Sequence, residues 1–391
     1  MPWKETCAMD ERKRFVNDWL TGTFTKTGLC AFYGISRPTG DKWIERALAE
    51  GTLALAERSR APHRHANATP QELVEMIVQT KLAHQYFGPK KVLDCLRRRY
   101  PRWPWPADST GGEILKRAGL VRPRRVHRRV HPDSTVFAGC RDCNQLWSAD
   151  FKGDFALRSR QRCYPLTMTD NFSRYLLQCQ ALAHPTTEAV KPWMEWAFRE
   201  YGLPDYIRTD NGPPFASLAV GGISALSKWW IRLGIRPQRI RPGRPGQNGR
   251  HERMHRSLKA ATVYPLQANL TAQQRRFDWF RHEFNWERSH EALDRTIPGK
   301  VYRPSAKPYP VKLPALEYGS DVTVRYVRPN GEIRWRGELL YVSHVLAKDY
   351  VALKQIDETV WEIHYSFHRL GLLNARTRTI SPTDRWHANT R

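Results

Sequence analysis

Three acidic residues lie at positions from which they could bind a metal ion. Asp150 is in the strand-like run Leu-Trp-Ser-Ala-Asp-Phe-Lys, Asp210 follows a short apolar strand, and Glu252 is in the first turn of a basic helix. The ends of such elements can present carboxylates on a rigid scaffold without burying an unpaired charge. Magnesium prefers oxygen ligands, and two such ions can bracket a scissile phosphate. We therefore predict that Asp150, Asp210 and Glu252 form one catalytic cluster that binds Mg²⁺ or Mn²⁺, with two ions per active site.

Alternating strands and helices must bring these acids together. Three successive strands are expected at 147–155, 164–169 and 175–181, followed by a helix at 186–201, a strand at 206–209, a helix at 226–233 and a strand at 238–240. Three antiparallel strands followed by alternating helices and strands is the order of a ribonuclease H-like fold. We predict an α/β mixed-sheet core of this type at 145–295.

Other acids in the same region could fill the first position. Asp154 competes with Asp150 but lies outside the motif, while Asp170 and Asp205 are expected to be turn or cap residues. Because Asp150 lies within the motif, it is the preferred ligand.

The helix that carries Glu252 has two distinct faces. Met254 begins an apolar stripe at helical spacing, whereas Glu252, Arg256 and Lys259 fall on another face. Arg256 and Lys259 are therefore expected to bind DNA phosphates beside the carboxylates.

The segment 241–249, just before that helix, contains three Gly and little apolar content. It is expected to be a mobile loop that closes over the site on DNA. Arg244 and Asn248 in this loop are predicted DNA contacts.

The N-terminal third is predicted to contain two helical DNA-binding domains. Residues 1–62 have three short helical patterns with a glycine-containing turn, as in a helix-turn-helix whose recognition helix presents Arg37, Thr39 and Lys42. A small helical packing module is the alternative. A second helical domain is expected at 66–121, with Thr69 and Thr110 as caps and with Lys90 and Lys91 on a basic face. That face favours phosphate contact over a merely solvated surface.

Residues 122–144 are expected to form a basic linker that lies along a DNA backbone or remains mobile. Its predicted DNA contacts are Arg124, Arg125, Arg128 and Arg129. A zinc site at His127, His131, Cys140 and Cys143 is an alternative by ligand type, but the histidines lie within the arginine run.

The C-terminal part is predicted to be a β domain. A proline-containing linker is expected at 296–315. Five short strands at 316–375 indicate a small SH3-like β-barrel, and a basic tail without regular structure is expected at 376–391. The dipeptide Asn330-Gly331 predicts a hairpin between the first two strands. The fold class is thus multidomain α+β.

Overall composition points to a polyanionic partner. The 391 residues include 64 Lys and Arg against 38 Asp and Glu, which leaves a net charge of +26. With 15 Trp and no lipidation or long amphipathic signal, nucleic acid is favoured over a membrane. No apolar run suits a membrane span, and an odd number of scattered cysteines fits a reducing compartment, so we expect a soluble cytoplasmic protein.

Three motifs in order carry a family resemblance. Leu-Trp-Ser-Ala-Asp ending at Asp150, Thr-Asp-Asn-Gly at 209–212, and Pro-Gly-Gln-Asn-Gly-Arg-His-Glu-Arg-Met-His at 245–255 resemble the DDE signature of bacterial insertion-sequence transposases with a retroviral-integrase core. The segment 284–293 resembles the part that follows this core in the same group. Two features depart from the pattern: 41 residues separate Asp210 from Glu252, more than is usual, and Ser289 stands where Pro is common. The extra residues are expected in a surface loop at 216–224.

This resemblance implies DNA transposition. Such an enzyme binds the terminal inverted repeats of its element, cleaves a strand to free a 3′ hydroxyl, and joins that hydroxyl to target DNA by two-metal-ion phosphoryl transfer. Its partners would be double-stranded DNA and further copies of the chain. A ribonuclease H-like nuclease and a non-catalytic DNA-binding regulator derived from a transposase are the alternative functions.

Overall fold

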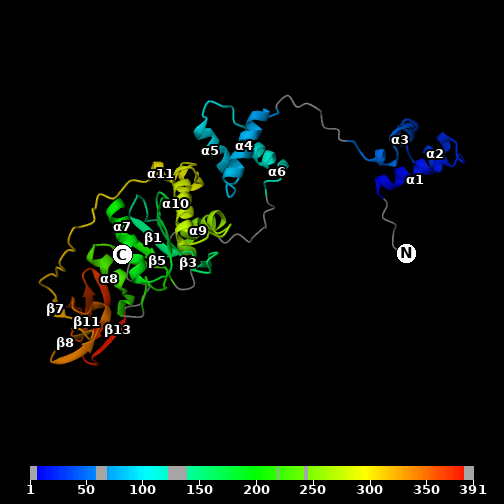
Figure 1. Ribbon diagram of the computed structural model, residues 1–391. Coiled ribbons are helices and arrows are strands. Elements are labelled where there is room, and N and C mark those ends of the chain that lie inside the picture. The colour runs from blue at the N-terminus through cyan, green and yellow to red at the C-terminus, as the bar shows by residue number, and fades with distance from the viewer. Residues whose placement is uncertain (1–6, 59–67, 122–138, 218–219, 242–244, 383–391) are drawn as a thin grey trace. The chain divides into compact units, whose positions relative to one another are not determined.

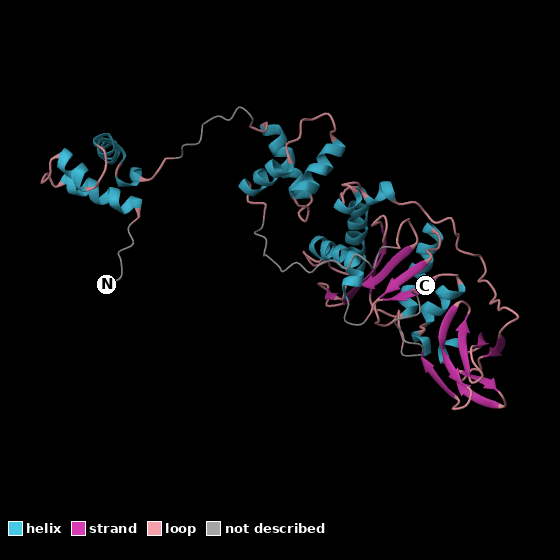
Figure 2. Cartoon of the chain, turned by 180° about the vertical axis from the view of Figure 1, so that it is seen from behind, coloured by secondary structure: helices cyan, strands magenta, loops and turns pink. Residues whose placement is uncertain are grey.

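The computed structural model describes residues 7–58, 68–121, 139–217, 220–241 and 245–382. The chain divides into two compact units, Met1–Thr69 and Pro70–Arg391. Within these ranges, strands occur only in the second unit (Figures 1 and 2). None of the helices in the described ranges combines the length and apolar character needed to cross a membrane. The predicted contacts Arg124, Arg125, Arg128, Arg129 and Arg244 lie outside the described residues, as do His127 and His131.

The first unit contains the three predicted helices around a small core of its own. These are α1 (Ala8–Leu20), α2 (Lys26–Phe32) and α3 (Arg37–Glu50). Phe15, Leu29, Trp43 and Leu55 are buried between them, and burial of this apolar surface holds the short helices together. The side chain of Thr25 accepts a hydrogen bond from the Gly28 amide and caps α2.

The second unit begins with three more helices, as predicted. They are α4 (Gln71–Ala83), α5 (Pro89–Arg99) and α6 (Asp108–Arg117), with Ile77, Leu93 and Leu115 in their shared core. The two predicted caps are wrong. Pro70 holds the cap position of α4, so Thr69 lies outside the helix, and α6 begins at Asp108, so Thr110 lies in its first turn.

Helix α5 is joined by polar contacts to the segment that follows Trp286, and acids partly match its cations. The buried Asp94 carboxylate accepts hydrogen bonds from the Ser289 hydroxyl at 2.6 Å and from Arg295. Arg97 pairs with Asp108 at 2.9 Å. Ser289, the departure from the family pattern, therefore supplies a hydroxyl that proline lacks, and it satisfies a buried carboxylate.

A six-stranded mixed sheet forms the centre of the second unit. Its first strand β1 (Leu146–Phe151) pairs antiparallel with β3 (Arg162–Asp170) and parallel with β5 (Tyr206–Thr209). The outer pairings are β3 with β4 (Leu176–Leu182), β3 with the short β2 (Phe155–Ala156), and β5 with β6 (Arg236–Arg239). The order of strands and helices confirms the predicted mixed-sheet core.

Helices cover both faces of this sheet (Figure 1). On one face, α7 (Thr187–Tyr201) and α8 (Ala225–Arg232) pack on the sheet around Trp147 and Ile207. On the other face, α9 (Gly249–Thr262) and α10 (Leu270–Trp286) pack on Leu176 and Cys179. The sheet and these helices bury a common apolar core, so the strand ends are held rigidly.

The segment 216–224 is not a free surface loop, as far as it is described. Val220–Gly222 forms a 3₁₀ turn, and Ile223 is buried in the core of the C-terminal sheet beside Leu370. The expectation of an exposed insertion is wrong, because this segment carries apolar side chains that the C-terminal sheet covers.

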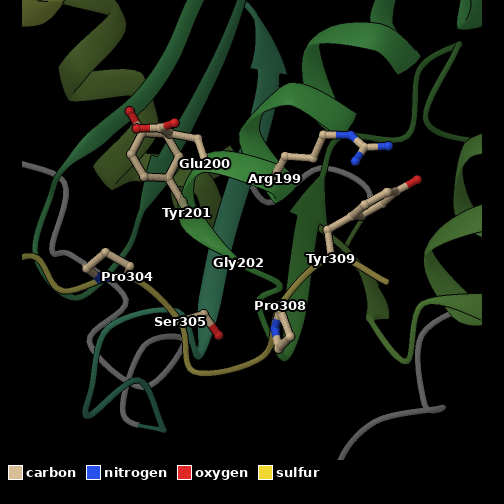
Figure 3. A pocket seen from close by; sticks show the side chains of 8 residues that line it. All are labelled: Arg199, Glu200, Tyr201, Gly202, Pro304, Ser305, Pro308 and Tyr309. Atoms are coloured by element: carbon tan, nitrogen blue, oxygen red, sulfur yellow. The ribbon is translucent and has the colours of Figure 1, made fainter. Parts of the chain in front are cut away.

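The predicted linker after α11 (Pro298–Val301) packs along the mixed-sheet core. Tyr302 and Tyr309 pack against the sheet core, and the Leu203 amide donates to the Lys307 carbonyl at 2.7 Å. A hollow of about 330 Å³ lies where this segment meets the end of α7, and the Arg199 guanidinium lies 4.6 Å from the Tyr309 ring centroid (Figure 3). None of the three predicted catalytic acids lines it.

The C-terminal part is an antiparallel sheet with more strands than predicted. Five strands pair in the order β13-β12-β11-β10-β7, and β8 pairs with β9. Their bounds are β7 (Thr323–Tyr326), β8 (Glu332–Trp335), β9 (Glu338–Tyr341), β10 (Tyr350–Gln355), β11 (Val360–Tyr365), β12 (His368–Asn374) and β13 (Thr379–Pro382).

Two C-terminal predictions are therefore wrong. The turn at Asn330-Gly331 forms, but β7 pairs with β10 while β8 pairs with β9. The tail includes β13, which pairs with β12 because Ile380 packs on the sheet core.

Candidate active site

The sheet register brings two of the three predicted acids to one edge. β1 and β5 run parallel, with Leu146 opposite Tyr206 and Ser148 opposite Arg208. Asp150 and Asp210 follow these pairs at equal distance along the chain, so the same register places them at neighbouring strand ends. The Gly212 amide donates to Asp210 Oδ1 at 3.2 Å and holds that carboxylate at the turn.

Electrostatics links the third acid to the other two. Burial raises the pKa of Asp150 to about 7, and the negative charges of Asp210 and Glu252 contribute to the increase. Burial also raises the pKa of Asp210. Carboxylates that repel one another in a partly buried site favour the binding of a cation between them.

Helix α9 presents Glu252 as the sequence pattern indicates. Met254 and Leu258 are buried against α10, whereas Glu252, Arg256 and Lys259 are exposed on the helix surface. The acid is thus in the first turn, with two cations on the following turns.

Asn248 supports Asp150 and does not lie on the surface. It is 3% exposed, and its Nδ2 donates to Asp150 Oδ2 at 3.3 Å, which corrects its prediction as a DNA contact. Pro245–Asn248 forms a 3₁₀ turn within the segment that was expected to be a mobile loop. Asn248 Oδ1 is buried and has no hydrogen-bond partner among the described residues. An additional oxygen acceptor on the side chain that contacts Asp150 fits the oxygen ligands that Mg²⁺ prefers.

Two buried histidines of α9 also support Asp150, and the sequence analysis missed them. The Thr167 hydroxyl donates to the Asp150 carbonyl at 3.0 Å, and it lies 2.8 Å from His251 Nε2 and 2.6 Å from His255 Nε2. Because the single hydroxyl proton is used on the carbonyl, both histidines are assigned as Nε2–H donors.

These histidines are neutral at physiological pH. Burial lowers the pKa of His251 to about 3 and lowers that of His255 further. The signal in the sequence was their spacing of four residues, which puts both on the helix face that packs on β3.

The competing acids have other roles. Asp154 is exposed and pairs with Arg162. Asp170 is buried and accepts hydrogen bonds from the Ser173 hydroxyl and the Asn144 amide, which is the turn role predicted for it.

The predicted DNA contacts of the helical domains differ in availability. Arg37 is exposed at the start of α3, whereas Thr39 lies 2.8 Å from the Ser36 hydroxyl, and Lys42 lies 4.3 Å from the Trp43 ring centroid. In α5, Lys90 is exposed and Lys91 is half-buried. Arg37 and Lys90 therefore have exposed side chains that can contact DNA.

The buried charge at Asp150 predicts a pH-dependent stability. The pKa of Asp150 is about 7 in the folded chain and lower in the unfolded chain. The folded chain therefore loses stability as the pH rises from the unfolded pKa through 7, because the carboxyl ionises in a desolvated position. In metal-free buffer at pH 8, we expect Asp150→Asn to increase the free energy of unfolding by an amount on the order of a few kcal/mol. The melting temperature should rise accordingly.

The gain should shrink as the pH falls from 8 to 5, because the wild-type carboxyl then becomes neutral. Thermal scans in a chelator at several pH values measure this difference. Asp154→Asn is the control, and an equal gain at pH 5 and pH 8 would contradict the assigned charge state.

The chain is similar to integrase cores and insertion-element proteins. Family profiles described as "Integrase core domain" match residues 141–245 and 233–298, and one described as "leucine-zipper of insertion element IS481" matches residues 9–83. An insertion element IS476 protein of Xanthomonas euvesicatoria is 31% identical over 253 residues, which span 63% of this chain and 70% of that protein. An insertion element IS407 protein of Burkholderia multivorans is 28% identical over 189 residues, which span 48% of this chain and 66% of that protein.

Among solved structures, the integrase catalytic core domain of HTLV-2 in complex with magnesium is similar over 41% of this chain and 98% of its own length. The sequence identity is 15% and the TM-score is 0.33.

Proposed function

Because this chain belongs to the insertion-element transposases of the IS481 family, which carry an integrase core domain, we propose that it joins element ends to target DNA. It binds the terminal inverted repeats of an insertion sequence and hydrolyses a DNA strand at each end to free a 3′ hydroxyl. That hydroxyl then attacks a phosphodiester of the target, and the 3′ oxygen of the cut target strand leaves as a hydroxyl. The observation that supports this most is the parallel register of β1 and β5, which brings Asp150 and Asp210 to neighbouring strand ends. The charge of Glu252 on α9 also contributes to the raised pKa of Asp150.

In this proposal, Asp150, Asp210 and Glu252 hold two Mg²⁺ or Mn²⁺ ions. When bound, such ions neutralise charge on the scissile phosphate and on the attacking and leaving oxygens. Asn248 orients the Asp150 side chain, and Thr167 fixes its backbone. The pair of histidines keeps Thr167 in place without adding positive charge beside the ligands.

Basic residues beside the acids position the DNA. Arg256 and Lys259 are exposed beyond Glu252 on α9, within reach of the phosphates that flank the cut.

The flanking domains recognise DNA and hold the assembly together. The N-terminal unit acts as a helix-turn-helix, and the C-terminal sheet acts as an SH3-like barrel that binds DNA or a neighbouring subunit. The enzyme works as a homo-oligomer at the nucleoid, because two element ends must be held together during joining.

The test uses purified protein, Mg²⁺, a labelled duplex from the ends of the element that encodes the chain, and a target plasmid. Labelled end joined to plasmid is the expected result. Cleavage of an RNA–DNA hybrid without joining would support the nuclease instead. Retarded migration of the duplex without any chemistry would support the DNA-binding regulator.

Replacement of the exposed Arg37, at the start of α3, is expected to weaken recognition of the element ends. A base contact by arginine contributes about 1–3 kcal/mol, so Arg37→Ala should weaken binding to the terminal repeat by about 10-fold to 100-fold. Gel retardation at fixed salt, with a scrambled duplex as competitor, measures this change. Arg14→Ala on α1, an exposed residue that pairs with Glu11, is the matched control. Equal losses for both variants, or for both duplexes, would remove Arg37 from sequence recognition.

A further inference from the structure

A set of metal-ligand side chains lies away from the three catalytic acids, where the helices α4 and α5 meet α10. His84 caps the end of α4, Cys95 is on α5, and Glu287 caps the end of α10. One ligand atom from each of the three lies within 4.8 Å of the others. Residues almost two hundred positions apart in sequence are therefore brought to one point by the tertiary fold.

The ligand types fit zinc. Thiolate, imidazole and carboxylate are its usual protein ligands, at about 2.0–2.3 Å from the ion. Two atoms bound at such lengths to a tetrahedral ion lie roughly 3.4 Å apart by geometry. His84 Nε2 and Glu287 Oε2 are separated by 3.3 Å, so these two atoms already have nearly this spacing.

The histidine is oriented as a metal ligand normally is. Its Nδ1 hydrogen-bonds to the Glu283 carboxylate, which is 1% exposed and also accepts from the Tyr86 hydroxyl. A carboxylate on one ring nitrogen fixes the tautomer and directs the other nitrogen at the ion. The His84 ring also stacks on Phe87, with centroids 4.7 Å apart, so its orientation is set before any ion binds.

The thiol of Cys95 has no other role among the described contacts. Cys95 is 7% exposed, is a free cysteine, and makes no hydrogen bond within the described part of the chain. Ion pairs of His84 with Glu283 and Glu287 would explain the polar contacts without a metal ion. They would not explain why the Cys95 thiol lies at the same point. Glu287 is 28% exposed in its side chain, which leaves room for a water molecule as fourth ligand.

We infer that His84, Cys95 and Glu287 bind a zinc ion that fastens the second helical domain to helix α10 of the catalytic core. The ion would act together with the Asp94–Ser289 and Asp94–Arg295 contacts at the same junction. This site is separate from the carboxylates that the proposed function uses.

Cobalt titration of the full-length, metal-stripped protein tests the inference without DNA. We expect a thiolate-to-cobalt charge-transfer band that saturates at about one ion per chain, and Zn²⁺ should displace it. Cys95→Ser should remove the band. Glu287→Gln should weaken cobalt binding by about 10-fold or more. The catalytic acids cannot produce this band, because no thiolate belongs to that set.

Control variants locate the ion. Cys179→Ser, at a buried position on β4, and the double variant Cys140→Ser with Cys143→Ser should both keep the band. The inference is overturned by absence of the band in the wild-type chain, by its persistence in Cys95→Ser, or by its loss in the double variant. Circular dichroism checks folding. If Cys95→Ser does not fold, an unchanged cobalt affinity in Glu287→Gln would still overturn the site.

Discussion

Replacing Asp210 with asparagine is expected to reduce strand joining by at least about 10³-fold while leaving binding to the element ends nearly intact. The metal site supplies several kcal/mol of transition-state stabilisation, and each 1.36 kcal/mol corresponds to about tenfold in rate. Asparagine keeps the size of the side chain and the hydrogen bond from the Gly212 amide to a side-chain oxygen. It removes a buried negative charge, so the fold should not suffer.

The measurement is single-turnover joining of a labelled terminal duplex to plasmid, with gel retardation of the same duplex alongside. Asp205→Asn is the matched control, because Asp205 lies five residues earlier and pairs with Lys307 at the surface. Joining that survives in Asp210→Asn, or that falls equally in Asp205→Asn, would exclude Asp210 from the catalytic cluster.

Removal of divalent cations is expected to cause a second large loss of strand joining. A chelator should lower joining to background, a fall of at least about 10³-fold, because it removes the ions that stabilise the attacking and leaving oxygens. Addition of Mg²⁺ or Mn²⁺ alone should restore the products. Binding to the element end should persist throughout, since the exposed cations of α3 do not depend on the metal.

The same experiment has a defined pH dependence. Protons compete with metal at Asp150, whose pKa is about 7, so its carboxylate is progressively protonated below that pH. The Mg²⁺ concentration for half-maximal joining should rise by about tenfold per pH unit below 7 and change little above it. A flat dependence between pH 5.5 and 8 would contradict the role of Asp150 as a metal ligand.

Loss of activity in a chelator could also come from the inferred zinc ion. The variant Cys95→Ser separates the two causes, because it lacks that ion from the start. If its joining still requires added Mg²⁺, the requirement belongs to the carboxylates. If Mg²⁺ fails to restore the wild-type chain and Zn²⁺ succeeds, the catalytic metal assignment is wrong.

The sequence by itself determined the local structure and the identity of the three acids as candidates. Periodicity located the helices of the N-terminal unit and the alternating strands and helices of the core, because side chains of a buried face recur at fixed spacing. It also assigned Met254 and Leu258 to the buried face of α9, with Glu252, Arg256 and Lys259 outside it. Local signals of this kind are contained in a few neighbouring residues.

Only the tertiary structure decided which distant residues meet. Asn248 looked like part of a mobile loop until the packing of α9 on the sheet placed it against Asp150. The strand at Thr379–Pro382 forms because β12 offers it an edge and the sheet core accommodates Ile380. His84, Cys95 and Glu287 have no common motif, and their ligand atoms come together through the docking of separate helices. Spacing along the chain carries no information about such contacts, because they depend on the register of the sheet and the packing of the helices upon it.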